Sequence, residues 1–295
     1  MRVTDAMRLN TALEAESTAS QQMSQLSQMA ASGLRVSQPS DDPAAYASIT
    51  ERSAQMGIIQ ARSTAASRAS GDLNLAESTL DQASNILVQL QQIAVEQANG
   101  SQDASSRANA ANQVASLRQQ LLALANTQGS TGNYLFGGTK TDTPPFDVNG
   151  VFSGNSHSTS VEIANGVLAT SNANGAAAFT AAGGQDVFAD VQALQDALAT
   201  NNVGQIQASL TTIQSSQSQV DAARIDAGLS AQRLQSATTV MSNALTQLQT
   251  AQANEQDADA PTTLSNLQQT QVAYEESLSV TKQILSVSLA GVNLG

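Results

Sequence analysis

The sequence predicts a mainly helical, elongated protein in which both halves of the chain build coiled-coil helices around a small β-rich insert. Two observations lead to this fold class. Over most of the chain, apolar residues recur at alternating steps of three and four, the spacing of a helix that packs against another helix. Between residues 139 and 185 that periodicity is absent, and Gly, Asn, Thr and Phe accumulate instead.

The composition limits the classes of function. Charged residues make up 12% of the 295 residues, compared with about 25% in an ordinary soluble domain. The net charge of −12 disfavours nucleic acid and anionic membranes as partners. The absence of cysteine excludes thiol chemistry, and the single histidine, His157, lies in a polar loop without a second imidazole nearby. We therefore expect no metal site, no cofactor and no enzymatic activity.

The middle of the chain carries the clearest helical pattern. One run from residue 73 ends at Asn99-Gly100, a helix stop and turn, and a second run continues from Val203 to Leu248. At 1.5 Å per residue the second helix would be roughly 70 Å long. The first run consists of Leu73, Ala76, Leu80, Ala83, Leu87, Leu90 and Ala94.

The insert shows two hairpin signals. Asn149-Gly150 and Asn165-Gly166 each separate short β-prone segments, and type I′ turns favour this dipeptide because both central residues need a positive φ. Pro144-Pro145 prevents a helix at the entry. The resulting organisation has a helical rod domain (39–138 with 186–257), a β-rich insert (139–185) and a layer of terminal helices (1–38 with 258–295).

Both terminal segments have apolar residues at helical spacing, and they need a partner to bury them. A break at 37–43 separates the first terminal helix from the next, with Asp42 as the expected N-cap and Pro43 as the first helical residue. Asp257 to Pro261 forms a similar break. The predicted assembly seam consists of Val3, Met7, Leu13, Met23, Leu26, Leu34, Leu264, Leu267, Tyr274, Leu278, Leu285 and Leu289.

Three segments resemble the flagellin superfamily of bacterial flagella. Ser32-Gly33-Leu34-Arg35, followed by Asp41-Asp42, resembles the N-terminal motif of flagellins and hook-associated proteins. Tyr134-Leu135-Phe136-Gly137, with Pro145-Phe146 close behind, and the segment from Leu267 to Leu278 resemble the hook-associated protein 3 branch, the hook–filament junction proteins. Flagellins usually differ at Tyr134–Gly137 and in the last helix.

The resemblance implies a flagellin-like rod in which the terminal helices form an inner coiled-coil layer and the insert projects outward. It also implies a location in the extracellular flagellum and export in unfolded form by the flagellar type III system. A cytoplasmic chaperone would hold the C-terminal helix before export. The implied partners are further copies of this chain, hook-associated protein 1 and flagellin.

Two features agree with the implied export and assembly. The N-terminal segment has charged residues and lacks the apolar stretch of a secretory signal peptide, and no apolar run approaches the roughly 18 to 20 residues of a membrane span. The terminal helices would stay largely disordered alone and fold on association. Two alternatives remain: a filament-forming flagellin and a soluble coiled-coil adaptor.

Overall fold

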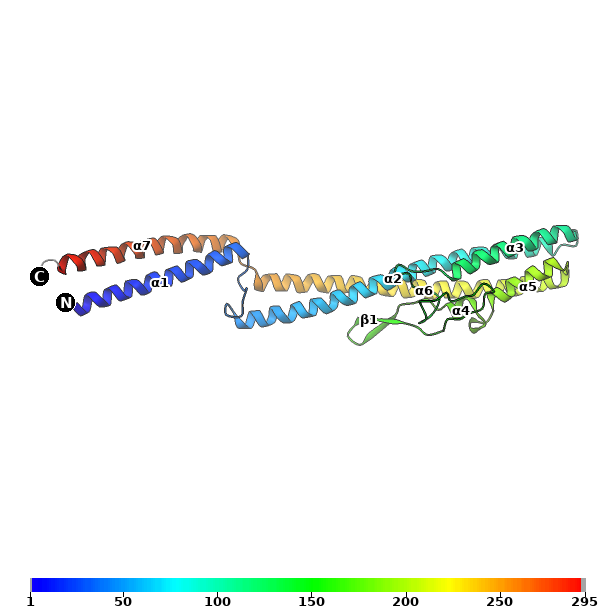
Figure 1. Ribbon diagram of the computed structural model, residues 1–295, viewed down its shortest axis with the longest axis horizontal. Helices are drawn as coiled ribbons and strands as arrows, with labels where there is room; N and C mark the ends of the chain where they lie inside the picture. Colours follow the sequence, from blue (N-terminus) through cyan, green and yellow to red (C-terminus); the bar gives the residue numbers. More distant parts are fainter. Residues whose placement is uncertain (1, 293–295) are drawn as a thin grey trace. The chain divides into compact units, whose positions relative to one another are not determined.

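The computed structural model describes the backbone of residues 2–292 and the side chains of residues 6–286 (Figure 1). A two-stranded antiparallel sheet and one turn of 3₁₀ helix, η1 (Ala181–Gly183), accompany the α-helices. The mainly helical class, with long helices from both halves of the chain and a small β insert, is confirmed. The elements are α1 (Arg2–Ser32), α2 (Pro43–Gln97), α3 (Ala104–Ala125), β1 (Ser160–Ala164), β2 (Val167–Thr170), α4 (Gly175–Phe179), α5 (Val187–Ala199), α6 (Val203–Gln256) and α7 (Ala260–Val292).

The chain forms two compact units. One unit contains Met1–Gly57 and Leu245–Gly295, and the other contains Ile58–Ala244. These units divide inside α2 and α6 and not at the helix breaks where the sequence places the domain boundaries. The reason is local packing, because Val36 in the first break lies in a small core with Ala45 and Ile49 of α2.

The core of the 58–244 unit lies between α2, α3, α5 and α6. All seven apolar residues of the predicted run from Leu73 to Ala94 are buried in it, so this heptad prediction is confirmed. The Ser70 hydroxyl donates a hydrogen bond to the Ala231 carbonyl, which links α2 to α6. Arg224 occupies a polar seam position of α6 and forms an ion pair with Asp81 of α2. Half-exposed ion pairs contribute little free energy, so this contact chiefly sets the register of the two helices.

Aromatic rings attach the insert to the helical core. All five phenylalanines of the chain lie in one cluster, and Phe146 is its centre. Its ring centroid lies 5.0 Å from that of Phe152, 5.6 Å from that of Phe179 and 5.1 Å from that of Phe188 in α5. The Phe136 ring meets the Phe179 ring edge to face at 5.5 Å. Edge-to-face and tilted pairs of this kind add stability beyond burial alone.

The insert contains less β structure than the sequence predicts. Asn165-Gly166 joins β1 to β2 as expected, but only Gly166 has a positive φ, so the type I′ assignment is wrong. A register irregularity between Glu162 and Ala164 accommodates the strand twist instead. At Asn149-Gly150 the chain also reverses direction: the Gly150 amide donates to the Asp147 carbonyl at 3.0 Å and the Asp147 amide to the Val151 carbonyl at 3.1 Å. Phe146 and Phe152 form a single antiparallel bridge, and only Gly150 has a positive φ, so the turn is not flanked by full strands and is not of type I′.

The two helix breaks pair with each other inside the terminal unit. Gly33, with φ +72°, ends α1 in the left-handed conformation that favours glycine. The Gly33 carbonyl accepts a hydrogen bond from the Ala258 amide at 2.9 Å, and the Arg35 amide donates to the Gln256 carbonyl at 2.7 Å. The Arg35 guanidinium donates to the Glu255 carbonyl at 2.6 Å. We call this arrangement of residues 32–42 and 255–259 the joint.

Two aspartates organise the joint. Asp41 accepts hydrogen bonds from the Ser37 and Gln38 amides at 2.9 and 3.0 Å, and these bonds lower its pKa. Asp42 accepts from the Ala45 amide at 3.0 Å and so caps α2, as the sequence predicts. That bond, assisted by Arg35 at 3.4 Å, lowers the pKa of Asp42. Both carboxylates therefore serve as structural acceptors.

Replacing Phe146 with alanine should lower the free energy of unfolding of the 58–244 unit by about 3–5 kcal/mol. The side chain is almost fully buried and contacts three other rings, so its loss leaves a cavity. Denaturant unfolding of the full chain measures the effect. Val148→Ala is the matched control, because Val148 is 80% exposed in the same loop. Equal unfolding midpoints for the two variants would contradict the anchoring role of the ring cluster.

Acidification should break the hydrogen bonds from the Ser37 and Gln38 amides to Asp41. A carboxyl group with a lowered pKa stabilises the fold above its ordinary pKa of 3.8 and loses that contribution as the pH falls through the lowered value. The Ser37 and Gln38 amide resonances should therefore titrate with a midpoint below 3.8 in NMR spectra. Asp41→Asn should abolish that titration. A midpoint at or above 3.8 in the parent chain would show that the hydrogen bonds to Asp41 do not form.

Candidate assembly interface

Helices α1 and α7 lie side by side in the terminal unit (Figure 1). Their least exposed positions follow a heptad pattern, which identifies the facing surfaces of the two helices. Many of the positions are occupied by small or hydroxyl residues and one by a glutamate. On α1 these positions are Leu9, Ala12, Glu16, Ala19, Met23, Leu26 and Met29, and on α7 they are Thr263, Leu267, Thr270, Tyr274, Ser277, Leu278, Thr281 and Ile284.

Part of the predicted seam lies on this contact and part lies outside it. Met23, Leu26, Leu34, Leu267, Tyr274 and Leu278 are half-buried, whereas Met7, Leu13, Leu264 and Leu285 are exposed. The side chains of Val3 and Leu289 lie outside the described residues.

The difference has a physical reason. The prediction selected the bulky apolar residues, whereas the actual contact follows a strict heptad period that passes through Thr263, Thr270 and Ser277. That spacing of seven was visible in the sequence as a row of hydroxyl residues, and it is the signal that identifies the α7 contact.

Four of the α7 positions in the α1–α7 contact carry a serine or threonine. Hydroxyl and alanine side chains bury less apolar surface than leucine, so each position contributes less to the hydrophobic effect. The Thr281 hydroxyl is also buried without a hydrogen-bond partner among the described residues. An unsatisfied buried hydroxyl costs free energy. The pair is therefore less stable than the leucine-rich core of the 58–244 unit.

Several apolar side chains of α7 remain exposed. Leu264, Val272, Val280 and Leu285 are all exposed, and Leu285 is 41% exposed. Leu264, Leu278 and Leu285 fall on one heptad position, which places them along one edge of the α1–α7 contact. We call these three residues the leucine edge.

The Tyr134–Gly137 motif has a packing role. Phe136 is fully buried in the aromatic cluster, and the Tyr134 amide donates to the Thr141 carbonyl at 2.9 Å. A Cβ atom on Gly137 would lie 2.2 Å from the Lys140 carbonyl oxygen, so no larger residue fits without a shift. The Leu135 amide donates to the Thr127 carbonyl. The motif thus links the end of α3 to the insert.

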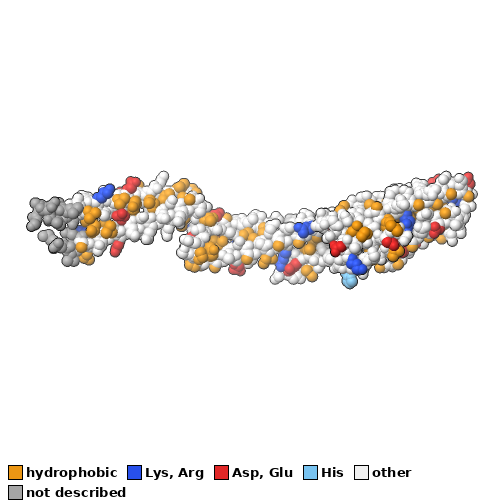
Figure 2. All heavy atoms as spheres, in the orientation of Figure 1, with side chains coloured by type: hydrophobic (Ala, Val, Ile, Leu, Met, Phe, Trp, Pro, Cys, Tyr) orange, Lys and Arg blue, Asp and Glu red, His pale blue; other side chains and the backbone are white. Residues whose placement is uncertain are grey.

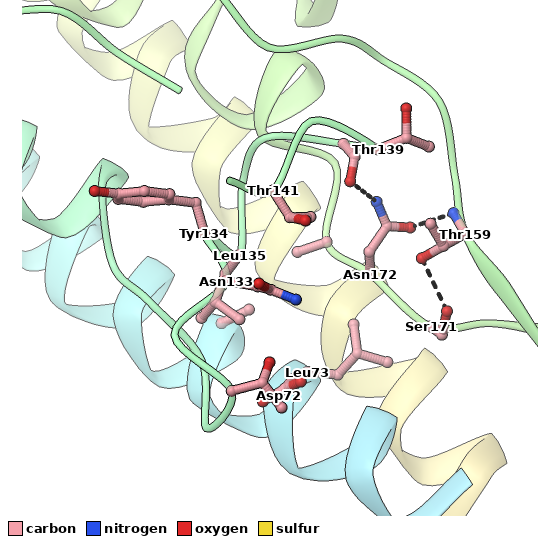
Figure 3. Close-up of a pocket in the computed structure, with 14 residues that line it drawn as sticks. Asp72, Leu73, Asn133, Tyr134, Leu135, Thr139, Thr141, Thr159, Ser171 and Asn172 are labelled. Atoms are coloured by element: carbon pink, nitrogen blue, oxygen red, sulfur yellow. Dashed lines mark hydrogen bonds between the residues drawn. The ribbon is translucent and has the colours of Figure 1, made fainter. Parts of the chain in front are cut away.

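A pocket of about 320 Å³ lies beside this motif (Figure 3). The Asn172 side chain accepts a hydrogen bond from the Thr159 amide at 2.8 Å and also contacts the Gly138 carbonyl at 3.5 Å. The Thr159 and Ser171 hydroxyls hydrogen-bond to each other at 2.9 Å. These polar groups satisfy one another, so this side of the pocket stabilises the insert.

The described surface carries few charges. Figure 2 shows few charged side chains, scattered singly or as red and blue neighbours among uncharged ones. Such a surface can pack against another protein without the cost of desolvating many ions. Residues 6–286 contain no group of three acidic or histidine side chains placed to hold a metal ion. Among the described helices, none combines the length and hydropathy of a membrane span.

Comparison with known proteins identifies related chains. Residues 3–141 match the bacterial flagellin N-terminal helical region. Flagellar hook-associated protein 3 of Escherichia coli (strain K12) is 37% identical over 114 residues, which are 39% of this chain and 36% of that protein. Its counterpart in Salmonella typhimurium (strain LT2) is 29% identical over 147 residues, 50% of this chain and 46% of that protein. These alignments thus span less than half the length of the curated relatives.

A solved structure shows the same fold. A Vibrio parahaemolyticus protein described as a flagellar hook-associated protein superposes with a TM-score of 0.67 and 25% identity, over 74% of this chain and 100% of that chain. The helical flagellin fold is that of a structural protein, in agreement with the expectation of no enzymatic activity. These matches agree with the resemblance seen in the motifs: residues 3–141 match the bacterial flagellin N-terminal helical region, and parts of the chain are similar to flagellar hook-associated protein 3.

Proposed function

We propose that this chain is a structural component of the bacterial flagellum that joins the hook to the flagellin filament. The observation that carries the proposal is the similarity to two proteins named flagellar hook-associated protein 3, together with a terminal helix pair that leaves apolar side chains exposed. The proposed neighbours are further copies of this chain, hook-associated protein 1 on one side and flagellin on the other.

Assembly would be coupled to folding of the terminal helices. The α1–α7 contact is rich in hydroxyl groups, so the pair gains little free energy by itself. Burial of the leucine edge against neighbouring copies adds about 25 cal/mol per Å², a gain that a single chain lacks. This difference favours ordered terminal helices where neighbours are already in place.

The same weakness suits export. Passage through the flagellar type III system would require the helix pair to unfold, and contact positions with hydroxyl side chains gain less from burial than leucine positions do. Before export, a cytoplasmic chaperone would cover α7, which exposes Leu264, Val272, Val280 and Leu285. An amphipathic helix in a partner's groove is a common recognition mode for such a segment.

A filament-forming flagellin is the second candidate, since the matching region is the flagellin N-terminal helical region. Purified chain added to flagellin seeds separates the candidates. Capping of the seed ends without growth supports the junction function, and long filaments of this chain alone support the flagellin function. A lack of binding favours the soluble adaptor.

In cells, deletion of the gene should leave hooks without filaments and release flagellin into the medium.

Leu285→Asp should block incorporation into the junction. Leu285 lies on the exposed leucine edge, and burying a carboxylate there would replace favourable burial with a desolvation cost of several kcal/mol. Incorporation should fall by roughly a hundredfold or more. Pull-down on hook preparations, followed by immunoblotting, measures the bound fraction.

Gln283→Asp is the matched control. Gln283 is exposed on α7 and lies away from the leucine edge, so the same added charge should be tolerated. The circular dichroism spectra of both variants should match that of the parent chain, as expected if the 58–244 unit stays folded. Normal junction assembly by Leu285→Asp would contradict the proposed contact.

A further inference from the structure

The chain contains four Asn-Gly pairs, and they differ in structural protection. They are Asn99-Gly100, Asn149-Gly150, Asn165-Gly166 and Asn174-Gly175. In an Asn-Gly pair the glycine amide nitrogen can attack the asparagine Cγ and form a cyclic succinimide. The reaction needs an amide that can lose its proton, an accessible Cγ and room for the backbone to close the ring. Glycine favours it because no side chain shields the nitrogen.

Hydrogen bonding protects two of the pairs. The Gly166 amide donates to the Glu162 carboxylate at 2.9 Å, and Arg62 holds the same carboxylate oxygen at 2.8 Å. An amide bound to a carboxylate resists deprotonation. The Gly150 amide donates to the Asp147 carbonyl at 3.0 Å, and Gly150 is buried against the Phe188 ring.

Packing protects the third pair. Asn174 caps α4, and its side-chain oxygen accepts a hydrogen bond from the Ala177 amide at 3.1 Å. Gly175 is buried, and a Cβ atom added there would come within 2.2 Å of the Phe136 carbonyl oxygen. The backbone therefore lacks the space that ring closure requires.

Asn99-Gly100 is the least protected of the four pairs. Both residues are exposed in the turn between α2 and α3. The Gly100 amide donates no hydrogen bond to any residue that the structure describes, and an added Cβ atom there would meet nothing within 4 Å. The Ser101 amide points at the Asn99 Oδ1 atom from 3.3 Å. A donor at that oxygen polarises the Cγ carbonyl and stabilises the oxyanion that forms when Cγ is attacked.

A buried arginine lies beside the same turn. Arg107 is only 4% exposed, and its guanidinium donates to the Asn99 carbonyl at 3.0 Å and to the Gln97 carbonyl at 3.0 Å. Its third contact is the Asn201 side chain at 2.5 Å, so no carboxylate neutralises it among these contacts. This positive charge favours loss of the Gly100 amide proton and stabilises negative charge at residue 99.

We propose that Asn99 is a site of spontaneous deamidation, and that the fold protects the other three Asn-Gly pairs. The Gly100 nitrogen loses its proton and bonds to Cγ of Asn99. The bond between Cγ and Nδ2 of Asn99 then breaks, and Nδ2 takes up a proton and leaves as ammonia. Water then opens the succinimide at either carbonyl, giving aspartate or isoaspartate. Each event adds one negative charge at the turn.

The product changes the turn that Arg107 holds. Isoaspartate carries the main chain through the side-chain carbon and lengthens it by one CH₂ group. The residue 99 carbonyl then leaves its position opposite Arg107, and the buried arginine loses one of its three partners. Aspartate at this position keeps the main chain intact and adds a carboxylate close to the arginine. Deamidation therefore alters the link between the α2–α3 turn and the α5–α6 turn.

The test follows all four sites in one sample. Purified full-length chain is incubated at mildly alkaline pH and physiological temperature, and peptide mapping by mass spectrometry quantifies aspartate and isoaspartate at each asparagine. The rate of conversion at Asn99 should be roughly tenfold or more above the rate at Asn165. This is the factor expected for breaking one hydrogen bond to a charged acceptor. In denaturant the four rates should converge. Faster conversion at any other pair in the folded chain would overturn the proposal.

Variants test the cause of the difference. Gly100→Ala should slow conversion at Asn99 without disturbing the fold, because the position has open space and no positive φ. Glu162→Ala should expose Asn165 to conversion, whereas Glu162→Gln keeps an acceptor for the Gly166 amide and should retain protection. Asn149 serves as an internal control for general loosening of the insert. Equal rates at Asn165 in the two Glu162 variants would overturn the assigned protection.

Discussion

Heptad packing between helices is the constraint on which the rest of the structure depends. In the 58–244 unit the facing positions hold leucine, alanine, isoleucine and valine, and nearly all are fully buried. In the α1–α7 pair the same period runs through Thr263, Thr270, Ser277 and Thr281. The geometry is the same in both, but the free energy is not, because hydroxyl side chains bury little apolar area. The same heptad spacing therefore gives a larger hydrophobic contribution in the 58–244 unit than at the hydroxyl positions of the α1–α7 pair.

The insert depends on the helical core for its stability. A two-stranded hairpin is marginal by itself in water. Here Phe136, Phe146, Phe179 and Phe188 join the insert, the end of α3 and α5 in one ring cluster. Gly137 and Gly175 allow the backbone to approach closely at this point. The insert can thus carry exposed surface while its base stays fixed.

The charged residues of the N-terminal motif have structural functions. Asp41 accepts hydrogen bonds from backbone amides, Asp42 caps α2, and Arg35 binds a carbonyl across the joint. These contacts end one helix and start the next. Arg107 does the same at the α2–α3 turn, where it satisfies carbonyl groups at the end of α2.

The sequence by itself determined the helices, their breaks and the buried face of the central helices, because apolar spacing and capping residues act over a few residues. Leu73 to Ala94, Asp42 with Pro43, and the β1–β2 hairpin are of this kind. The sequence contains the row of Thr263, Thr270 and Ser277 at a spacing of seven, but only the tertiary structure shows that this row faces α1, since hydroxyl side chains give no hydrophobic signal. It also decided that the turn at Asn149-Gly150 is flanked by a single bridge, between Phe146 and Phe152, whose rings pack in the aromatic cluster. Local chemistry sets which elements form, and long-range packing sets which of their faces meet.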